Sequence, residues 1–120
     1  MIRANQHPVS RVTIRDQIAC AANQVLTSTD GRFRLIYHTD GNLALYREDG
    51  SVTWNRDGGS AGVVAFQTDG NFVAYDDTGQ AVWNSETFDN EGAYLLLQND
   101  GNMVIYSGAN AVLWSTGTAE

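Results

Sequence analysis

The sequence predicts an all-β protein made of three similar antiparallel units. Twelve Gly stand against one Pro in a chain of 120 residues, and short apolar runs alternate with polar turns. The dipeptide Asp-Gly separates two such runs at Asp40, Asp69 and Asp100, which is a strong β-hairpin signal. The units repeat after 29 and then 31 residues, as Trp54, Trp83 and Trp114 mark. Repeats of this size bury their apolar faces by packing together, and 120 residues suffice for one domain with a core.

The segment before the repeats carries a single strand signal. Val12 and Ile14 alternate with Arg and Thr, as in a half-exposed strand, and we expect the first ten residues to be loose. We therefore divide the chain into an N-terminal extension, residues 1–15, and a domain of three repeats, residues 16–120.

Each unit is predicted to contain a strand, an Asp-Gly turn, a second strand, a second turn and a short strand that carries Trp. The alternation of apolar and polar residues and the turn residues between them set these limits. The predicted strands are Phe33–His38, Leu43–Arg47 and Val52–Asn55, then Val63–Gln67, Phe72–Asp76 and Ala81–Asn84, then Ala93–Gln98, Met103–Tyr106 and Ala111–Ser115.

The number of residues in each Asp-Gly loop decides which face of the hairpin is buried. An odd loop, with residue 67 paired to 73 and residue 98 to 104, gathers an almost wholly apolar set on one face, whereas an even loop would send Gln67 to the core. We therefore predict odd loops and a core of Leu35, Tyr37, Leu43, Leu45, Val64, Phe66, Phe72, Ala74, Leu95, Leu97, Met103 and Ile105. The three Trp are predicted to turn inward and meet near the axis; the alternative is that they form exposed platforms for sugar rings.

A motif of five residues at alternate positions occurs in every unit, on the face opposite the predicted core. Two copies are identical and the first is altered: the residues are Gln67, Asp69, Asn71, Val73 and Tyr75, then Gln98, Asp100, Asn102, Val104 and Tyr106, then His38, Asp40, Asn42, Ala44 and Tyr46. Turn chemistry alone accounts for Asp-Gly-Asn, but it does not account for the Gln before it or the Tyr after it. We therefore interpret the motif as a repeated binding site.

The side chains of the motif suit a hexose. Asp supplies acceptors, Asn and Gln supply donors and acceptors, and Tyr supplies a hydroxyl. Val offers a small apolar surface for the C–H groups of a sugar ring. No metal or other cofactor is needed, and His38 is not expected to bind a metal because no second His or Cys stands at a suitable spacing.

The charge and the cysteine content limit the classes of partner and the cellular locations that we expect. All seven basic residues are Arg at or before Arg56, and Asp57–Glu120 carries nine acidic residues and no base, so nucleic-acid binding is not expected. No apolar stretch is long enough to cross a membrane, and residues 1–10 show no secretory signal. Cys20 is alone, so a disulfide within the chain is excluded. These features favour a cytoplasmic or non-classically secreted protein.

The pattern Gln-x-Asp-x-Asn-x-Val-x-Tyr resembles the hallmark of the bulb-type (monocot) mannose-binding lectins. The likeness runs from Asp16 to Gly117 and includes Gly31–Leu35 and the three Trp. It implies a β-prism II fold, with three four-stranded antiparallel sheets around a pseudo-threefold axis and the Trp side chains at the centre. It also implies that Asp and Asn bind the axial O2 of mannose, Gln binds O3, Tyr reaches O4, and Val rests on the ring carbons.

This sequence departs from the family pattern in the first copy. His38 replaces Gln and Ala44 replaces Val, so we expect that copy to bind weakly or not at all. Gly41 stands where plant members carry a disulfide Cys. The resemblance further implies a homodimer in which residues 111–116 pair with the partner chain.

Three other functions remain to be weighed against a metal-independent, multivalent lectin for mannose-containing glycans. A glycosidase needs two carboxyl groups about 5–9.5 Å apart, yet each motif Asp would lie in its own sheet. A calcium module needs more acidic residues at alternate positions. A structural or protein-interaction domain with vestigial sugar sites is the principal alternative.

Overall fold

The computed structural model describes residues 11–15, 18–20, 25–57 and 60–120. These residues form strands and no helix, as the sequence predicted. The strands are β1 (Arg11–Arg15), β2 (Ile18–Cys20), β3 (Val25–Thr27), β4 (Phe33–Tyr37), β5 (Leu43–Arg47), β6 (Val52–Arg56), β7 (Val63–Phe66), β8 (Phe72–Tyr75), β9 (Ala81–Asn84), β10 (Tyr94–Gln98), β11 (Met103–Tyr106) and β12 (Val112–Ser115).

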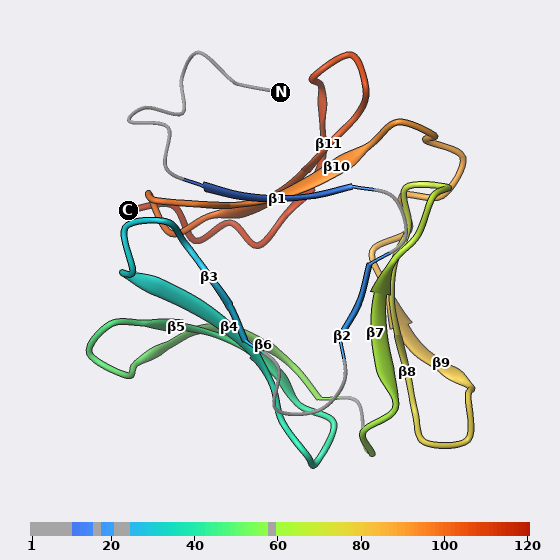
Figure 1. The fold of residues 1–120 in the computed structure, drawn as a ribbon, viewed down its shortest axis with the longest axis horizontal. Coiled ribbons are helices and arrows are strands. Elements are labelled where there is room, and N and C mark those ends of the chain that lie inside the picture. Colours follow the sequence, from blue (N-terminus) through green and yellow to red (C-terminus); the bar gives the residue numbers. More distant parts are fainter. Residues whose placement is uncertain (1–10, 16–17, 21–24, 58–59) are drawn as a thin grey trace.

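Three four-stranded antiparallel sheets surround a common axis (Figure 1). Their strand orders are β1-β10-β11-β12, β2-β7-β8-β9 and β3-β4-β5-β6. The last three strands of each sheet come from one repeat, and the first comes from the segment that precedes the repeats. The strand predicted around Val12 and Ile14 is therefore present as β1, where it pairs with β10. The predicted three-sheet prism is confirmed.

Each Asp-Gly loop contains three residues, so the odd parity is confirmed but the predicted pairing is wrong by two positions. Gln67 N donates to Asn71 O at 2.8 Å, and Gly70 N donates to Gln67 O at 2.9 Å. Gln67 thus lies opposite Asn71 and not opposite residue 73, and Gln98 N likewise donates to Asn102 O at 3.0 Å. The tighter loop arises because Gly70 and Gly101 have φ near +90°, a conformation that closes a three-residue hairpin loop.

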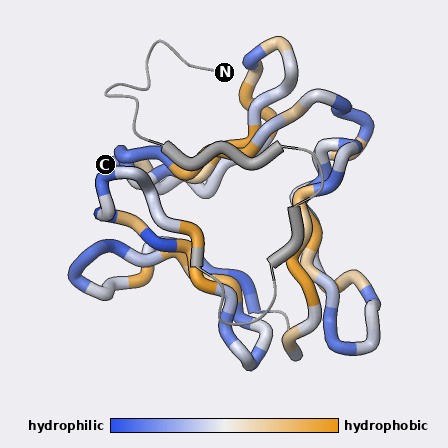
Figure 2. The backbone as a smooth tube through the Cα atoms, in the orientation of Figure 1, coloured by the Kyte–Doolittle hydropathy of each residue, from blue (hydrophilic) through white to orange (hydrophobic). Residues whose placement is uncertain are grey.

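The twelve predicted core residues all lie in one buried cluster between the sheets. Figure 2 shows hydrophobic stretches along the strands and hydrophilic residues in the peripheral loops. Leu45, Leu95, Leu97, Met103 and Ile105 are completely buried, and Phe33 and Ala93 join the cluster beside the predicted residues. The three sheets therefore share one core.

The three Trp rings meet at the centre of this core, as predicted. Their centroids are 5.9 Å apart for Trp54 and Trp83, and 5.7 Å apart for each pair that includes Trp114. All three pairs have the edge-to-face geometry that aromatic rings prefer. Phe72 extends the cluster, with its centroid 5.7 Å from that of Trp83. Each sheet contributes one Trp, so the cluster joins all three.

We expect Trp83→Ala to lower the free energy of unfolding by about 3 kcal/mol or more, the usual cost of removing a large aromatic side chain from a core. Urea denaturation followed by circular dichroism measures this. Val112→Ala is the control, because Val112 is 62% exposed in a Trp-bearing edge strand and should cost less than about 0.5 kcal/mol. Equal effects of the two substitutions would contradict the role of the Trp cluster.

Candidate functional site

The second copy of the motif forms a polar group on the outer face of the sheet β2-β7-β8-β9. Gln67 directly follows β7, Asp69 and Asn71 flank the glycine of the loop, and Tyr75 ends β8. Gln67 Nε2 donates to Tyr75 Oη at 2.5 Å, and Asn71 N donates to Asp69 Oδ1 at 2.9 Å. These four side chains are partly exposed, while Val73 is only 4% exposed. Polar atoms can therefore meet a ligand here, and little apolar surface accompanies them.

The third copy repeats these bonds in a more buried setting. Gln98 Nε2 donates to Tyr106 Oη at 2.8 Å, and Asn102 N donates to Asp100 Oδ1 at 2.9 Å. However, Gln98, Val104 and Tyr106 are only 6%, 2% and 7% exposed. Asp100 is exposed and Asn102 partly so. Gln98 and Tyr106 are thus less accessible to a ligand than Gln67 and Tyr75.

A tyrosine peculiar to the third repeat contributes to this burial. Tyr94 lies opposite Tyr106 in the strand register and stacks on it, with ring centroids 5.5 Å apart and planes at 25°. Val63 stands opposite Tyr75 in the second repeat, and Arg34 opposite Tyr46 in the first. The tyrosine of the motif therefore has a different neighbour in each repeat.

In the first copy, histidine replaces glutamine in the hydrogen bond to tyrosine. His38 Nε2 and Tyr46 Oη are 2.7 Å apart, and the tautomer of the ring decides which of them donates. Asn42 N donates to Asp40 Oδ1 at 2.9 Å, as in the other copies. Ala44 is completely buried. The structure thus brings the five residues of each copy together in all three repeats.

Hydroxyl groups behind the second and third copies were not predicted. Asn71 Oδ1 accepts a bond from Thr87 N at 3.2 Å and lies 3.3 Å from Ser85 Oγ. Asn102 Oδ1 has the same partners in Thr118 N at 3.2 Å and Thr116 Oγ1 at 3.1 Å. A sequence signal for them exists, since a hydroxyl residue follows Trp83 and Trp114 at the second and fourth positions.

Two carboxylates in the second turns of the repeats have lowered pKa values, but both lie outside the motif. The hydroxyl of Ser51 donates to Asp49 and lowers its pKa; the hydroxyl of Thr78, together with the amide of Gln80, does the same for Asp76. Both effects stabilise the turns in their ionised form. Among the described residues, no group of three or more His, Cys, Asp or Glu is arranged to hold a metal ion, and no helix could span a membrane.

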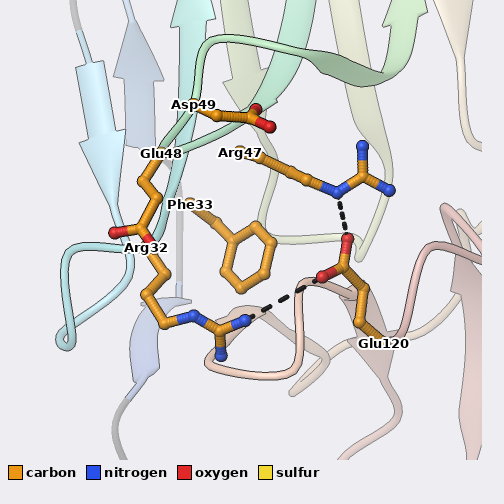
Figure 3. Close-up of a pocket in the computed structure, with 6 residues that line it drawn as sticks. All are labelled: Arg32, Phe33, Arg47, Glu48, Asp49 and Glu120. Carbon is orange, nitrogen blue, oxygen red and sulfur yellow. Dashed lines mark hydrogen bonds and ion pairs between the residues drawn. The ribbon is translucent and has the colours of Figure 1, made fainter.

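A cavity of about 180 Å³ lies away from the motif residues, between the first repeat and the end of the chain. Figure 3 shows the carboxylate of Glu120 between the guanidinium groups of Arg32 and Arg47, with both of which it forms ion pairs. Arg32 also lies over the ring of Phe33, 4.9 Å from its centroid. Glu120 N donates to Asp100 O at 2.6 Å. These contacts join the first and third repeats, and the two arginines already have a carboxylate partner.

Comparison with solved structures gives clear relatives. A lectin of Marasmius oreades is 36% identical, with 88% of this chain and 90% of that chain aligned and a TM-score of 0.83. A monomeric monocot mannose-binding lectin from Gastrodia elata is 31% identical over 92% and 99% of the two chains, with a TM-score of 0.78. The mannose-specific agglutinin of snowdrop (Galanthus nivalis) bulbs, solved with methyl-α-D-mannoside, is 30% identical over 92% and 98%, with a TM-score of 0.66. No protein-family model and no curated protein sequence matches the chain.

The glycine of the motif is required by close packing as well as by backbone conformation. Gly70 and Gly79 have φ of +90° and +88°, but a Cβ on Gly70 would lie 2.6 Å from Asn90 O, whereas a Cβ on Gly79 would meet open space. We expect Gly79→Ala to lower the free energy of unfolding by about 1–2 kcal/mol, the cost of a left-handed conformation. Gly70→Ala should cost clearly more in the same urea titration. Equal losses would show that the loop moves away from Asn90 without cost.

Proposed function

Because this chain belongs to the family of bulb-type mannose-binding lectins, we propose that it binds α-mannose of glycans through the five-residue motif and without a metal ion. At the coarser level the assignment is plain: the solved relatives are lectins, so the protein is a carbohydrate-binding lectin and not an enzyme. The observation that carries the finer proposal is the second copy, where four polar side chains with the right donors and acceptors are grouped and partly exposed.

Each of the four polar side chains of the second copy has a distinct role in this proposal. Asp69 Oδ1 is used by the amide of Asn71, so its other carboxylate oxygen is the acceptor for the axial O2 of mannose, and Asn71 donates to the same hydroxyl. Gln67 binds O3 and Tyr75 binds O4. The Gln67–Tyr75 bond orients both groups before the sugar arrives, which reduces the entropy lost on binding.

Preference for mannose over glucose follows from the position of O2. Glucose carries this hydroxyl equatorially, so Asp69 and Asn71 would lose their shared partner. Leaving buried polar groups unpaired costs on the order of 1–3 kcal/mol per group. The site itself is shallow, so we expect a dissociation constant of roughly 1 mM, which corresponds to a binding free energy of about −4 kcal/mol.

Burial ranks the three copies. The second has the complete motif with all four polar side chains partly exposed, and we propose it as the principal site. The third has the same residues, but Gln98 and Tyr106 are nearly covered, so a sugar would first meet Asp100 and Asn102. In the first copy, His38 replaces Gln and the completely buried Ala44 offers no apolar surface. We therefore expect that copy to contribute least.

The alternative function, a protein-interaction domain with vestigial sugar sites, is distinguished by substitution. We expect Asn71→Ala to weaken binding of methyl α-D-mannoside at least tenfold, because Asn71 would lose its bond to O2, and Asn102→Ala to have a smaller effect. Titration followed by NMR measures both. Gln80→Ala, an exposed change in the neighbouring turn, is the control. Binding by the Asn71/Asn102 double variant that equals wild type would exclude the assigned sites, and loss of binding on addition of EDTA would exclude metal independence.

The homodimer implied by family resemblance stays a prediction. Within one chain, β12 pairs with β11, with Ser115 opposite Val104 and Trp114 opposite Ile105. Strand exchange would replace these pairs by the same pairs between two chains, so each sheet would remain four-stranded. We expect light scattering to give twice the chain mass of 13.1 kDa, with two sets of sites and a gain in avidity. A single species at the chain mass at all concentrations would contradict it.

A further inference from the structure

The hydroxyl pairs behind the second and third copies fix the orientation of the asparagine amides. A side-chain amide presents an oxygen on one side and an NH₂ group on the other, and the two are distinguished by their partners. A backbone N–H can only donate, so the atom that faces Thr87 N must be the oxygen of Asn71. The same holds for Asn102 and Thr118 N. The NH₂ group of each asparagine is thereby turned away from these residues.

The hydroxyl of the threonine holds its own backbone against the motif. Thr87 Oγ1 donates to Gly70 O at 2.5 Å, and Thr118 Oγ1 donates to Gly101 O at 2.7 Å. These bonds join the segment that carries the backbone donor to the Asp-Gly-Asn loop itself. Thr87 is 4% exposed, so water cannot readily replace the bond, and the distance from Thr87 N to Asn71 Oδ1 depends on it.

Each hydroxyl group has a single hydrogen, which fixes the direction of the remaining hydrogen bonds. Because the hydrogen of Thr87 is given to Gly70 O, the 2.7 Å contact between Ser85 and Thr87 requires Ser85 to donate, so Ser85 has no hydrogen left for Asn71 Oδ1, which lies 3.3 Å away. Ser85 Oγ in turn accepts from Phe72 N at 3.1 Å. In the third copy, Thr116 Oγ1 lies 2.7 Å from Thr118 Oγ1 and accepts from Met103 N at 3.1 Å. Two repeats with different side chains at the first position thus have the same directed chain of bonds.

The first copy has no hydroxyl residue at these two positions, since Arg56 and Gly58 stand there, and Gly58 lies outside the described residues. Arg56 stands two residues after Trp54, where the other repeats have Ser85 and Thr116. Asn42 Oδ1 is instead 3.2 Å from Nδ2 of Asn55, which is an exposed amide. Turning both amides by 180° reverses the donor and acceptor and preserves the bond. This contact therefore does not define which way the amide of Asn42 faces.

We propose that the hydroxyl pairs Ser85/Thr87 and Thr116/Thr118 are positioning residues that hold Asn71 and Asn102 with NH₂ toward the sugar. The proposal rests on the proposed function and extends it beyond the five residues of the motif. Without this support an amide would sample both orientations and would present its oxygen, instead of its NH₂ group, to the O2 hydroxyl of the sugar for part of the time.

The test compares Thr87→Val, which keeps the shape of the side chain and removes the hydroxyl, with Thr87→Ser, which keeps the hydroxyl. In an Asn102→Ala background, we expect Thr87→Val to weaken binding of methyl α-D-mannoside about tenfold and Thr87→Ser to weaken it less than twofold. NMR of the side-chain NH₂ groups reports on the amide orientation without sugar. This experiment uses the chain that retains Asn102, whose signals serve as the internal control. The Asn71 signals should broaden or double in Thr87→Val only, while the Asn102 signals stay unchanged.

Each outcome bears on the proposal. A folded Thr87→Val variant with wild-type affinity and unchanged Asn71 signals would overturn it. If Thr87→Val does not fold, Ser85→Ala makes the same test, because it removes the second hydroxyl with a smaller change in volume. If even the wild type fails to bind the mannoside while the Asn71 signals still respond to Thr87→Val, the proposed function fails and the positioning role stands.

Discussion

The conformation of one glycine in each hairpin loop is the constraint on which the structure depends. Gly41, Gly70 and Gly101 have φ near +90° and close loops of three residues. The odd count sends one set of strand residues to the shared core and the alternate set outward. A loop one residue longer or shorter would place Gln67 among the core residues. The same glycine therefore determines both the packing of the three sheets and the side chains presented outside.

The core residues could be predicted from the sequence, because they depend only on an odd number of residues in each hairpin loop. Which residues face each other across the hairpin could not be predicted. Leu97 and Met103 share a face in any odd loop, whether the loop closes at Asn102 or further along the strand. Choosing between these pairings requires the left-handed glycine, which depends on backbone bonds rather than on apolar pattern. The strands β2 and β3 were also missed, because three residues each are too few to show alternation. They were expected only through family resemblance, which implied four strands in each sheet.

The sequence predicted which residues make up the motif. It did not predict the groups that hold the motif asparagines or how exposed each motif side chain is. Five residues at alternate positions are visible in a sequence because one continuous hairpin carries them all. The donor that holds Asn71 is instead the backbone N–H of Thr87, 16 residues away in the segment after the Trp strand. The burial of Tyr106 depends partly on Tyr94, which lies on the neighbouring strand. Such contacts arise from register between strands, and a motif read along one strand does not contain them.

On the proposed function, these differences suggest how a repeat protein would hold three similar sites of unequal affinity on one scaffold. The core residues of the repeats are interchangeable in kind, since any apolar side chain of suitable volume fills the prism. A sugar site tolerates less, because each hydroxyl needs a donor or acceptor that faces it before binding. On the proposed positioning role, loss of one supporting hydroxyl would leave the apolar core in place and remove the orientation of an asparagine amide. On this proposal a repeat could lose its binding role while it continues to supply its Trp and its strands to the common core, and the first repeat, with Arg56 and Gly58 at the positions of the hydroxyl pair, is where we expect this.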